Sequence, residues 1–150
     1  MTSIILYTSK KGSTKKCAQY VHAQNKKTEL CSLSDFQGEI SRYDSLVLCS
    51  PIYFGQVPKK VRLFLQKNEE IILQKKVYII LNAMNMDAYD TVLKSNFSDR
   101  LRAQAKIVYG GGAYYFDKLN WLEKIVVRKF SGYKVTFEDL QYDKLNKVQL

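Results

Sequence analysis

The stretch of this sequence that is best suited to chemistry is YTSKKGST, at residues 7–14, directly after an apolar run. It combines one glycine with two lysines and several hydroxyl side chains. If the stretch leads into a helix, the free amides of the first turn and the positive end of the helix dipole favour an anion. The alternative is an ordinary helix cap, in which Ser13 or Thr14 satisfies those amides. The candidate anion contacts are Ser9, Lys10, Lys11, Gly12, Ser13 and Thr14.

The spacing of this stretch limits which anion it would hold. It lacks the GxxxxGK[ST] pattern of nucleoside triphosphate sites and the GxGxxG pattern of dinucleotide sites. It contains no cysteine nucleophile, and no aspartate pair follows the preceding apolar run. A monophosphate group fits the stretch best.

The elements that must position this loop alternate along the chain. Short apolar runs predict strands at 3–7, 28–33, 45–50, 76–83 and 105–111. Helical spacing of apolar residues predicts helices at 13–24, from Pro58 onward, at 88–101 and at 119–130. Strands that alternate with helices of this length indicate a parallel sheet with helices on both faces. We therefore expect a single three-layer α/β domain over residues 1–150.

Ligands of such sheets bind beyond the carboxyl ends of the strands, so three further loops become candidates. Aromatic residues after the third strand suit a flat conjugated ring, although core or rim packing is an alternative. Amides after the fourth strand suit the polar edge of a ring or a turn, and glycines after the fifth permit close backbone approach to a ligand or a plain turn. The candidate contacts are Pro51, Ile52, Tyr53, Phe54, Gly55, Asn82, Ala83, Asn85, Gly111, Gly112 and Tyr115.

Composition adds a charge argument. The 150 residues are 46% hydrophobic and carry a net charge of +10, which suggests an anionic partner. The lysines are scattered and no nucleic-acid motif appears, so nucleic acid is not expected. Three cysteines without a CxxC pair predict buried free thiols rather than disulfides or a metal site. With no leader and no apolar run long enough to span a bilayer, we expect a cytoplasmic location.

The order strand, TSKKGST, helix, strand, SPIYFG, helix resembles the flavodoxin superfamily, whose phosphate loop ends in glycine, any residue, threonine (Gly12, Ser13 and Thr14). The resemblance covers about residues 3–130. It implies a flavodoxin-like three-layer sandwich with a five-stranded parallel sheet in the order 2-1-3-4-5, and FMN as cofactor. It also implies that the first loop contacts the FMN phosphate, and that the loops at 51–55 and near Asn82 flank the flavin ring.

Within this superfamily, SPIYFGQVPKKVRLFLQKN and YGGGAYYFDKLNWLEKIVVRKFSG resemble the family related to menaquinone-dependent protoporphyrinogen dehydrogenase. That resemblance implies an FMN oxidoreductase of heme biosynthesis that uses a quinone as acceptor. The sequence departs from this family's pattern in two places. Positions that are basic in the family's ring loop are Tyr53 and Gln56 here, and the last segment, FEDLQYDKLNKVQL, leaves room only for a short final element.

Two functional hypotheses follow. The first is an FMN oxidoreductase acting on an anionic small molecule or a quinone, with the chemistry on the flavin and no catalytic side chain. The second is a flavodoxin-type electron carrier for a redox partner protein. The resemblance implies that such carriers are typically acidic, because they dock basic partners, so the net charge of +10 favours the first hypothesis. The basic helix at 118–130 suits peripheral contact with a membrane, and the alternative is a core-packing helix.

Overall fold

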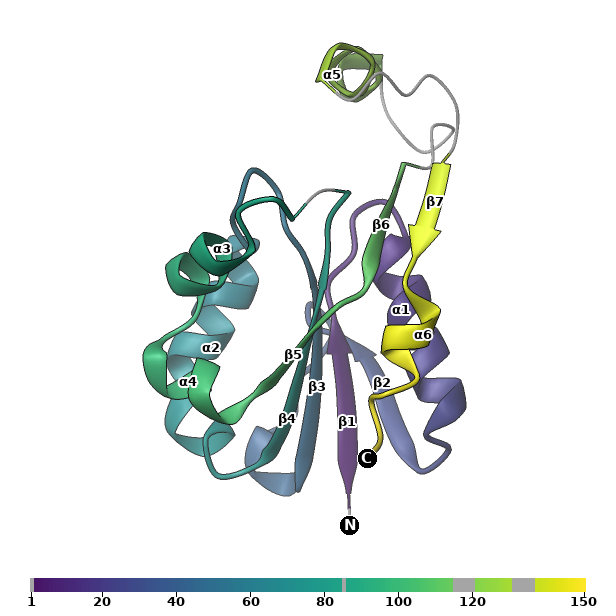
Figure 1. Cartoon of the computed structure of the whole chain (residues 1–150). Coiled ribbons are helices and arrows are strands. Elements are labelled where there is room, and N and C mark those ends of the chain that lie inside the picture. Colours follow the sequence, from purple (N-terminus) through teal and green to yellow (C-terminus); the bar gives the residue numbers. More distant parts are fainter. Residues whose placement is uncertain (1, 85, 115–120, 131–136) are drawn as a thin grey trace.

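The computed structural model describes residues 2–84, 86–114, 121–130 and 137–150. Five parallel strands form one sheet in the order β2-β1-β3-β4-β5, as Figure 1 shows. Their bounds are β1 Ser3–Tyr7, β2 Thr28–Ser32, β3 Ser45–Pro51, β4 Lys76–Asn82 and β5 Lys106–Tyr109. The predicted three-layer α/β fold with this strand order is confirmed.

The two faces of the sheet are covered by different helices (Figure 1). One face packs against α2 (Lys59–Ile72), α3 (Tyr89–Asn96) and α4 (Asp99–Gln104). The other face packs against α1 (Ser13–Gln24) and the short α6 (Tyr142–Leu145). A 3₁₀ turn, η1 (Ile40–Arg42), precedes β3.

The central strands explain why the sequence forms this sheet. Every residue of β3 is buried, and so is every residue of β4 after Lys76. A strand with helices on both sides must be apolar on both faces, which is why these segments read as continuous apolar runs without alternation. The register pairs Leu6 with Leu48 and Leu48 with Ile79 across the sheet.

The helix predicted at 88–101 is two helices. The backbone of Phe97 is extended, and the Ser98 side chain then caps α4 by accepting a hydrogen bond from the Leu101 amide (3.1 Å). The sequence predicted one helix because the apolar spacing continues through the break. Val92, Phe97 and Leu101 all pack into the same core cluster. A cap of this kind starts a new helix at a small polar residue.

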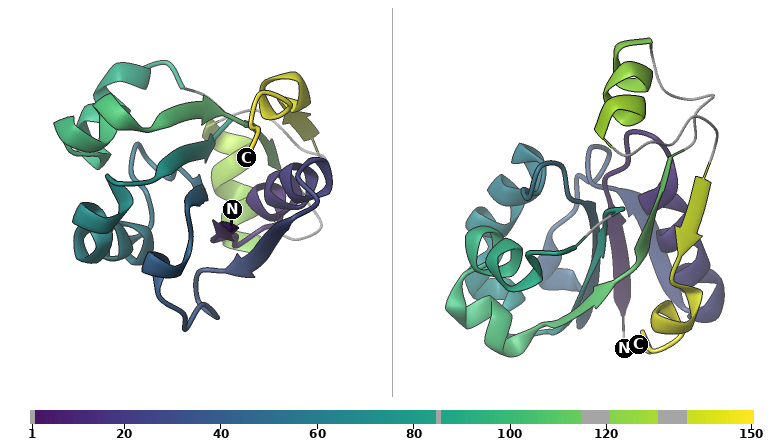
Figure 2. Two further views of the ribbon diagram at one scale, coloured as in Figure 1. Left: turned by 90° about the horizontal axis from the view of Figure 1, so that it is seen from below. Right: turned by 45° about the horizontal axis from the view of Figure 1, so that its top comes forward.

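The C-terminal third contains a second, two-stranded antiparallel sheet that the sequence did not predict. It pairs β6 (Gly111–Tyr114) with β7 (Phe137–Leu140). Between them in the sequence lies α5 (Trp121–Phe130), which sits beyond the carboxyl ends of the main strands (Figures 1 and 2).

The position of α5 bears on the alternatives for the predicted helix at 119–130. The first half of α5 does not pack into the core. Trp121, Leu122 and Ile125 are all exposed, Trp121 by 74%. Within the part of the chain that the structure describes, no helix is long and apolar enough to cross a membrane. The short final element predicted after residue 137 corresponds to β7 and α6.

Candidate functional site

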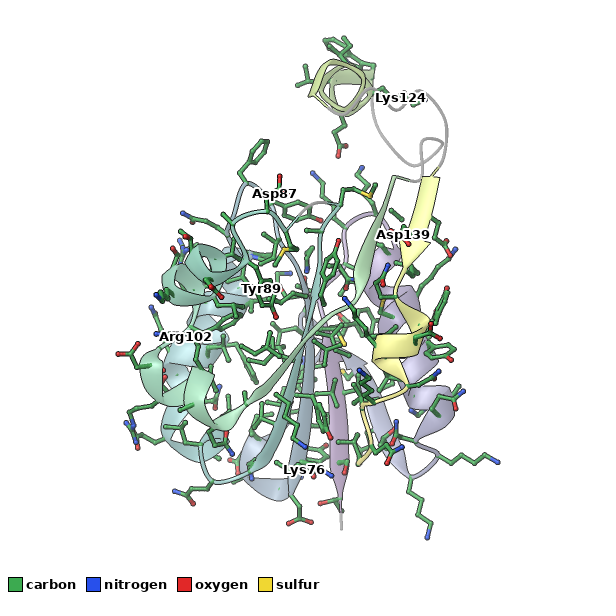
Figure 3. All side chains as sticks on the ribbon, viewed as in Figure 1. Lys76, Asp87, Tyr89, Arg102, Lys124 and Asp139 are labelled. Carbon is green, nitrogen blue, oxygen red and sulfur yellow. The ribbon has the colours of Figure 1, made fainter. Side chains whose placement is uncertain are left out.

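The predicted loops meet at one end of the sheet, because all five strands are parallel and their carboxyl ends share one edge. β1 and β3 are neighbours, and so are β3 and β4. The amide of Ile52 donates to the carbonyl oxygen of Asn82 (2.8 Å), which ties the loop after β3 to the end of β4. Figure 3 shows Asp87, in the loop after β4, and Lys124, on α5, at this same end.

The loop from Ser9 to Gly12 leads directly into α1. Gly12 is the N-cap residue with φ +105°, a left-handed conformation that glycine adopts at little cost. Its amide donates to Ser9 Oγ (3.0 Å), which folds the loop back on itself. Because the N-cap is a glycine, no side chain among the described residues caps the helix from that position. Ser13 and Thr14, the residues of the capping alternative, lie inside α1 rather than at its N-cap, and Thr14 is buried.

The loop after β3 displays its aromatic residues to solvent. Tyr53 and Gln56 exchange backbone hydrogen bonds of 2.9 and 3.1 Å around a two-residue turn formed by Phe54 and Gly55. Both turn residues have positive φ, 51° and 78°, as a tight type I′ turn requires. Phe54 is 97% exposed in this disfavoured backbone conformation. Strain of this kind with an exposed aromatic ring is typical of a ligand contact.

Asn96, the last residue of α3, holds this turn in place. Its Nδ2 donates to the Gly55 carbonyl oxygen (2.8 Å), and its Oδ1 accepts from the Val57 amide (2.9 Å). The sequence does not predict this role, because an asparagine near a helix end carries no local signal of a contact 39 to 41 residues away.

Asn82 lies at the end of β4 as predicted, but its side chain faces the protein interior. Its Nδ2 donates to Cys17 Sγ (3.2 Å) and to the Gly111 carbonyl oxygen (3.0 Å). Its Oδ1 is buried and accepts no hydrogen bond from the described residues. The amide thus joins α1, β4 and β6, and a contact from Asn82 to a ring edge stays a prediction.

Burial dominates the chemistry of the cysteines near this amide. It raises the pKa of Cys17 to about 11, against a smaller lowering by the Asn82 hydrogen bond. Burial also raises the pKa of Cys49 well above its ordinary value. Both thiols are therefore protonated at neutral pH, and Cys17, Cys31 and Cys49 are all free. Cys17 and Cys49 are buried as predicted, while Cys31 is partly exposed.

The glycines after β5 are required by close packing within the protein. A Cβ on Gly111, which has φ +80°, would lie 2.0 Å from the Asp139 carbonyl oxygen. A Cβ on Gly112 would lie 2.5 Å from the carbonyl group of Ala83. Both glycines lie in β6 rather than in the plain turn that was the alternative, and close packing within the protein accounts for them, so their contact with a ligand stays a prediction. The predicted contacts Asn85 and Tyr115 lie outside the described residues.

Comparison with known families decides what this arrangement is. A family model described as Flavodoxin domain matches residues 4–139. The chain belongs to the flavodoxin family. The match includes all four loops of the site. No curated protein matches the chain by sequence.

Solved structures share the fold of this flavodoxin domain. Flavodoxin 1 from Bacillus cereus has 19% identity and a TM-score of 0.55, over 74% of this chain and 82% of its own. Flavodoxin 2 from the same organism has 24% identity and a TM-score of 0.55, with the same coverage. A flavoprotein from Lactobacillus acidophilus NCFM, solved in complex with FMN, has 16% identity and a TM-score of 0.56, over 87% of this chain and 98% of its own. At these identities the similarity shows the fold alone.

Proposed function

We propose that this flavodoxin domain binds FMN and transfers electrons between the flavin and a redox partner protein. The observation that carries the proposal is the loop from Ser9 to Gly12. It turns through a left-handed glycine into the uncapped start of α1, at the carboxyl end of β1. Family membership supports the same cofactor.

The residues present fit a phosphate group. The first amides of a helix and its dipole favour an anion, and Gly12 leaves the approach to them clear of a side chain at the N-cap. Within the loop, Lys10 is exposed and Lys11 is partly exposed. These residues would hold the FMN phosphate, with Ser9 fixing the conformation of the loop.

The loop after β3 would hold the flavin ring. Tyr53 and Phe54 offer two aromatic faces, and Asn96 fixes the turn that carries them. When bound, FMN supplies the one- and two-electron chemistry, and the chain supplies binding, orientation and electrostatics. Burial, followed by the charge of Glu123, raises the pKa of Tyr53, which keeps its hydroxyl neutral beside the ring.

An absorbance spectrum of the purified protein tests this proposal most simply. Flavin bands that disappear on protein denaturation, together with reduction by a flavodoxin reductase and reoxidation by an acceptor protein, would support it. Protein that is colourless and takes up no added FMN would contradict it.

A second function, oxidation of an anionic substrate such as a porphyrinogen with a quinone as acceptor, is favoured by charge. A carrier that docks basic partners is expected to be acidic, whereas this chain has a net charge of +10. Turnover of a porphyrinogen by the flavin-loaded protein with a quinone present would select this function. Efficient exchange with a reductase but no such turnover would select the carrier.

The exposed apolar side chains of α5 suit peripheral contact with an anionic membrane, which would bring a quinone to the same end of the sheet. Trp121, Leu122 and Ile125 lie beside Lys124, a pattern that such interfacial helices share. Co-flotation with anionic but not zwitterionic vesicles, lost in the Trp121→Ala variant, would support this contact. Flotation that is the same for both vesicles or unaffected by the substitution would contradict it.

A further inference from the structure

The short final helix leaves the β5 edge of the sheet partly uncovered. α6 has only four residues and packs against both α1 and β5, and it leaves the outermost strand only partly covered. Ile107, Val108 and Tyr109 are only partly buried, in contrast to the wholly buried β3. An apolar edge is therefore accessible from outside the fold.

A cavity of about 480 Å³ lies at this edge. It runs around the edge of β5, because Ile107 packs with Met86 on the face covered by α3, whereas Val108 packs on the face covered by α1 and α6. Its lining residues are Met86, Tyr89, Ile107, Val108, Tyr109, Lys144 and Lys147. The volume falls within the range of pockets that bind small organic molecules. In the sheet order, β3 and β4 separate this cavity from β1 and its phosphate loop.

Two lysines supply positive charge at the rim. Lys144 Nζ lies 5.3 Å from the centre of the Tyr109 ring, which holds the ammonium over the cavity wall. Both Lys144 and Lys147 are exposed, and neither forms an ion pair with a carboxylate in the described part of the chain. Their charges are therefore available to an anion from outside the protein.

Hydrogen bonds fix the Tyr109 ring, which lines the cavity, and set the direction of the β5 backbone amides. The Tyr109 hydroxyl donates to the Ala83 carbonyl oxygen (2.5 Å), which fixes the ring across the end of β4. The Gly110 amide donates to the Leu81 carbonyl oxygen (2.8 Å), toward β4. Because successive amides of a strand alternate in direction, the amides of Ile107 and Tyr109 point toward the open edge. The cavity thus has an apolar wall, two ammonium groups and backbone N–H donors.

We propose that this cavity binds a small amphipathic carboxylate, an apolar chain or ring that carries one carboxylate group. The apolar body lies along the exposed edge of β5, between Met86 and Ile107 on one face and Val108 on the other, and the carboxylate pairs with Lys144 and Lys147. A cation of the same shape is excluded by the two ammonium groups. Met86 belongs to the loop after β4, but β3 and β4 separate the two lysines and β5 from the phosphate loop, so the proposal does not depend on the flavin.

Titration of the FMN-loaded protein with decanoate, followed by amide NMR shifts and calorimetry, tests the proposal. We expect saturable binding of one decanoate, with the largest shifts at Ile107 and Tyr109, and no binding of decyltrimethylammonium, which has the same chain and the opposite charge. The double variant Lys144→Gln/Lys147→Gln should bind decanoate about tenfold more weakly.

The matched control is Lys26→Gln/Lys27→Gln, which removes the same charge from two exposed lysines between α1 and β2. It should bind decanoate as the original chain does. The proposal is overturned if decanoate does not bind, if the ammonium analogue binds equally well, or if both double variants lose the same affinity. Shifts centred on the loops after β1 and β3 would also overturn it, since they would place the carboxylate at the flavin site.

Discussion

Lys11, in the loop after β1, and Glu123, on α5, form an ion pair with 2.7 Å between Nζ and Oε1. The same carboxylate contributes, after burial, to the raised pKa of Tyr53 in the loop after β3. Glu123 therefore lies near both the phosphate loop and the aromatic loop. A helix distant in the sequence thus brings a negative charge to the place where we expect a phosphate.

The first prediction concerns the sign of that charge. In the Glu123→Gln variant, FMN should bind more tightly, because the phosphate no longer competes with a carboxylate for Lys11. The pair is partly exposed, so we expect about 0.5–1 kcal/mol, or roughly a two- to fivefold lower Kd. Quenching of flavin fluorescence on titration of the apoprotein measures the change.

Glu39→Gln provides the control, because it removes the same charge from an exposed position beside η1. Its FMN affinity should stay that of the original chain. Weaker binding in Glu123→Gln would show instead that the carboxylate supports the site by holding α5 in place.

The second prediction uses Trp121, the only tryptophan of the chain. It is 74% exposed at the start of α5, two residues from Glu123. Because α5 lies over the phosphate loop, bound FMN should quench most of the tryptophan emission. Titration with FMN while emission is recorded tests this expectation. Emission that stays constant while the flavin binds would show that α5 lies elsewhere in the complex.

The third prediction separates binding from stability at Phe54. Its ring is 97% exposed and its φ is 51°, so the side chain buries little and the backbone is strained. Asparagine tolerates this conformation better, and Phe54→Asn should therefore unfold at the same denaturant concentration or a higher one. Loss of the stacking face should cost about 0.5–1.5 kcal/mol of FMN binding, a roughly two- to twelvefold higher Kd. Unchanged affinity would remove Phe54 from the site.

The fourth prediction compares two left-handed glycines. Gly12→Ala and Gly55→Ala place a Cβ at φ +105° and +78°, and each should lower the free energy of unfolding by about 1–2 kcal/mol. A Cβ on Gly55 meets no atom of the described residues within 4 Å, so the loss of stability in that variant reports backbone strain alone. Gly12→Ala should in addition weaken FMN binding more than Gly55→Ala does. FMN affinity that stays unchanged in Gly12→Ala would contradict a phosphate contact at the start of α1.

Short-range sequence patterns correctly predicted the strands and the helix start that depend on neighbouring residues. The apolar runs of β3 and β4 and the glycine before α1 place three loops correctly at one end of the sheet. The pairing of β6 with β7 was not predicted, because two four-residue strands that are 22 residues apart in the sequence carry no clear alternation.

The directions of side chains and the contacts between distant segments could not be predicted from the sequence either. Asn82 was placed at the correct strand end, but its bonds to Cys17 and Gly111 depend on how α1 and β6 pack around it. The Asn96 contacts with the turn at Gly55 and the ion pair of Lys11 with Glu123 join segments that meet only in the folded chain. The ends of the strands determine where the site lies, and these contacts determine how its side chains are oriented.

The central claim is that the loop from Ser9 to Gly12 binds the phosphate of FMN. The most direct measurement compares the affinities of the apoprotein for FMN and for riboflavin, which has the same ring and ribityl chain but no phosphate. We predict that FMN binds far more tightly and that added salt reduces this difference, since charge contributes to it. Equal affinities for the two flavins, or no binding of either, would contradict the claim.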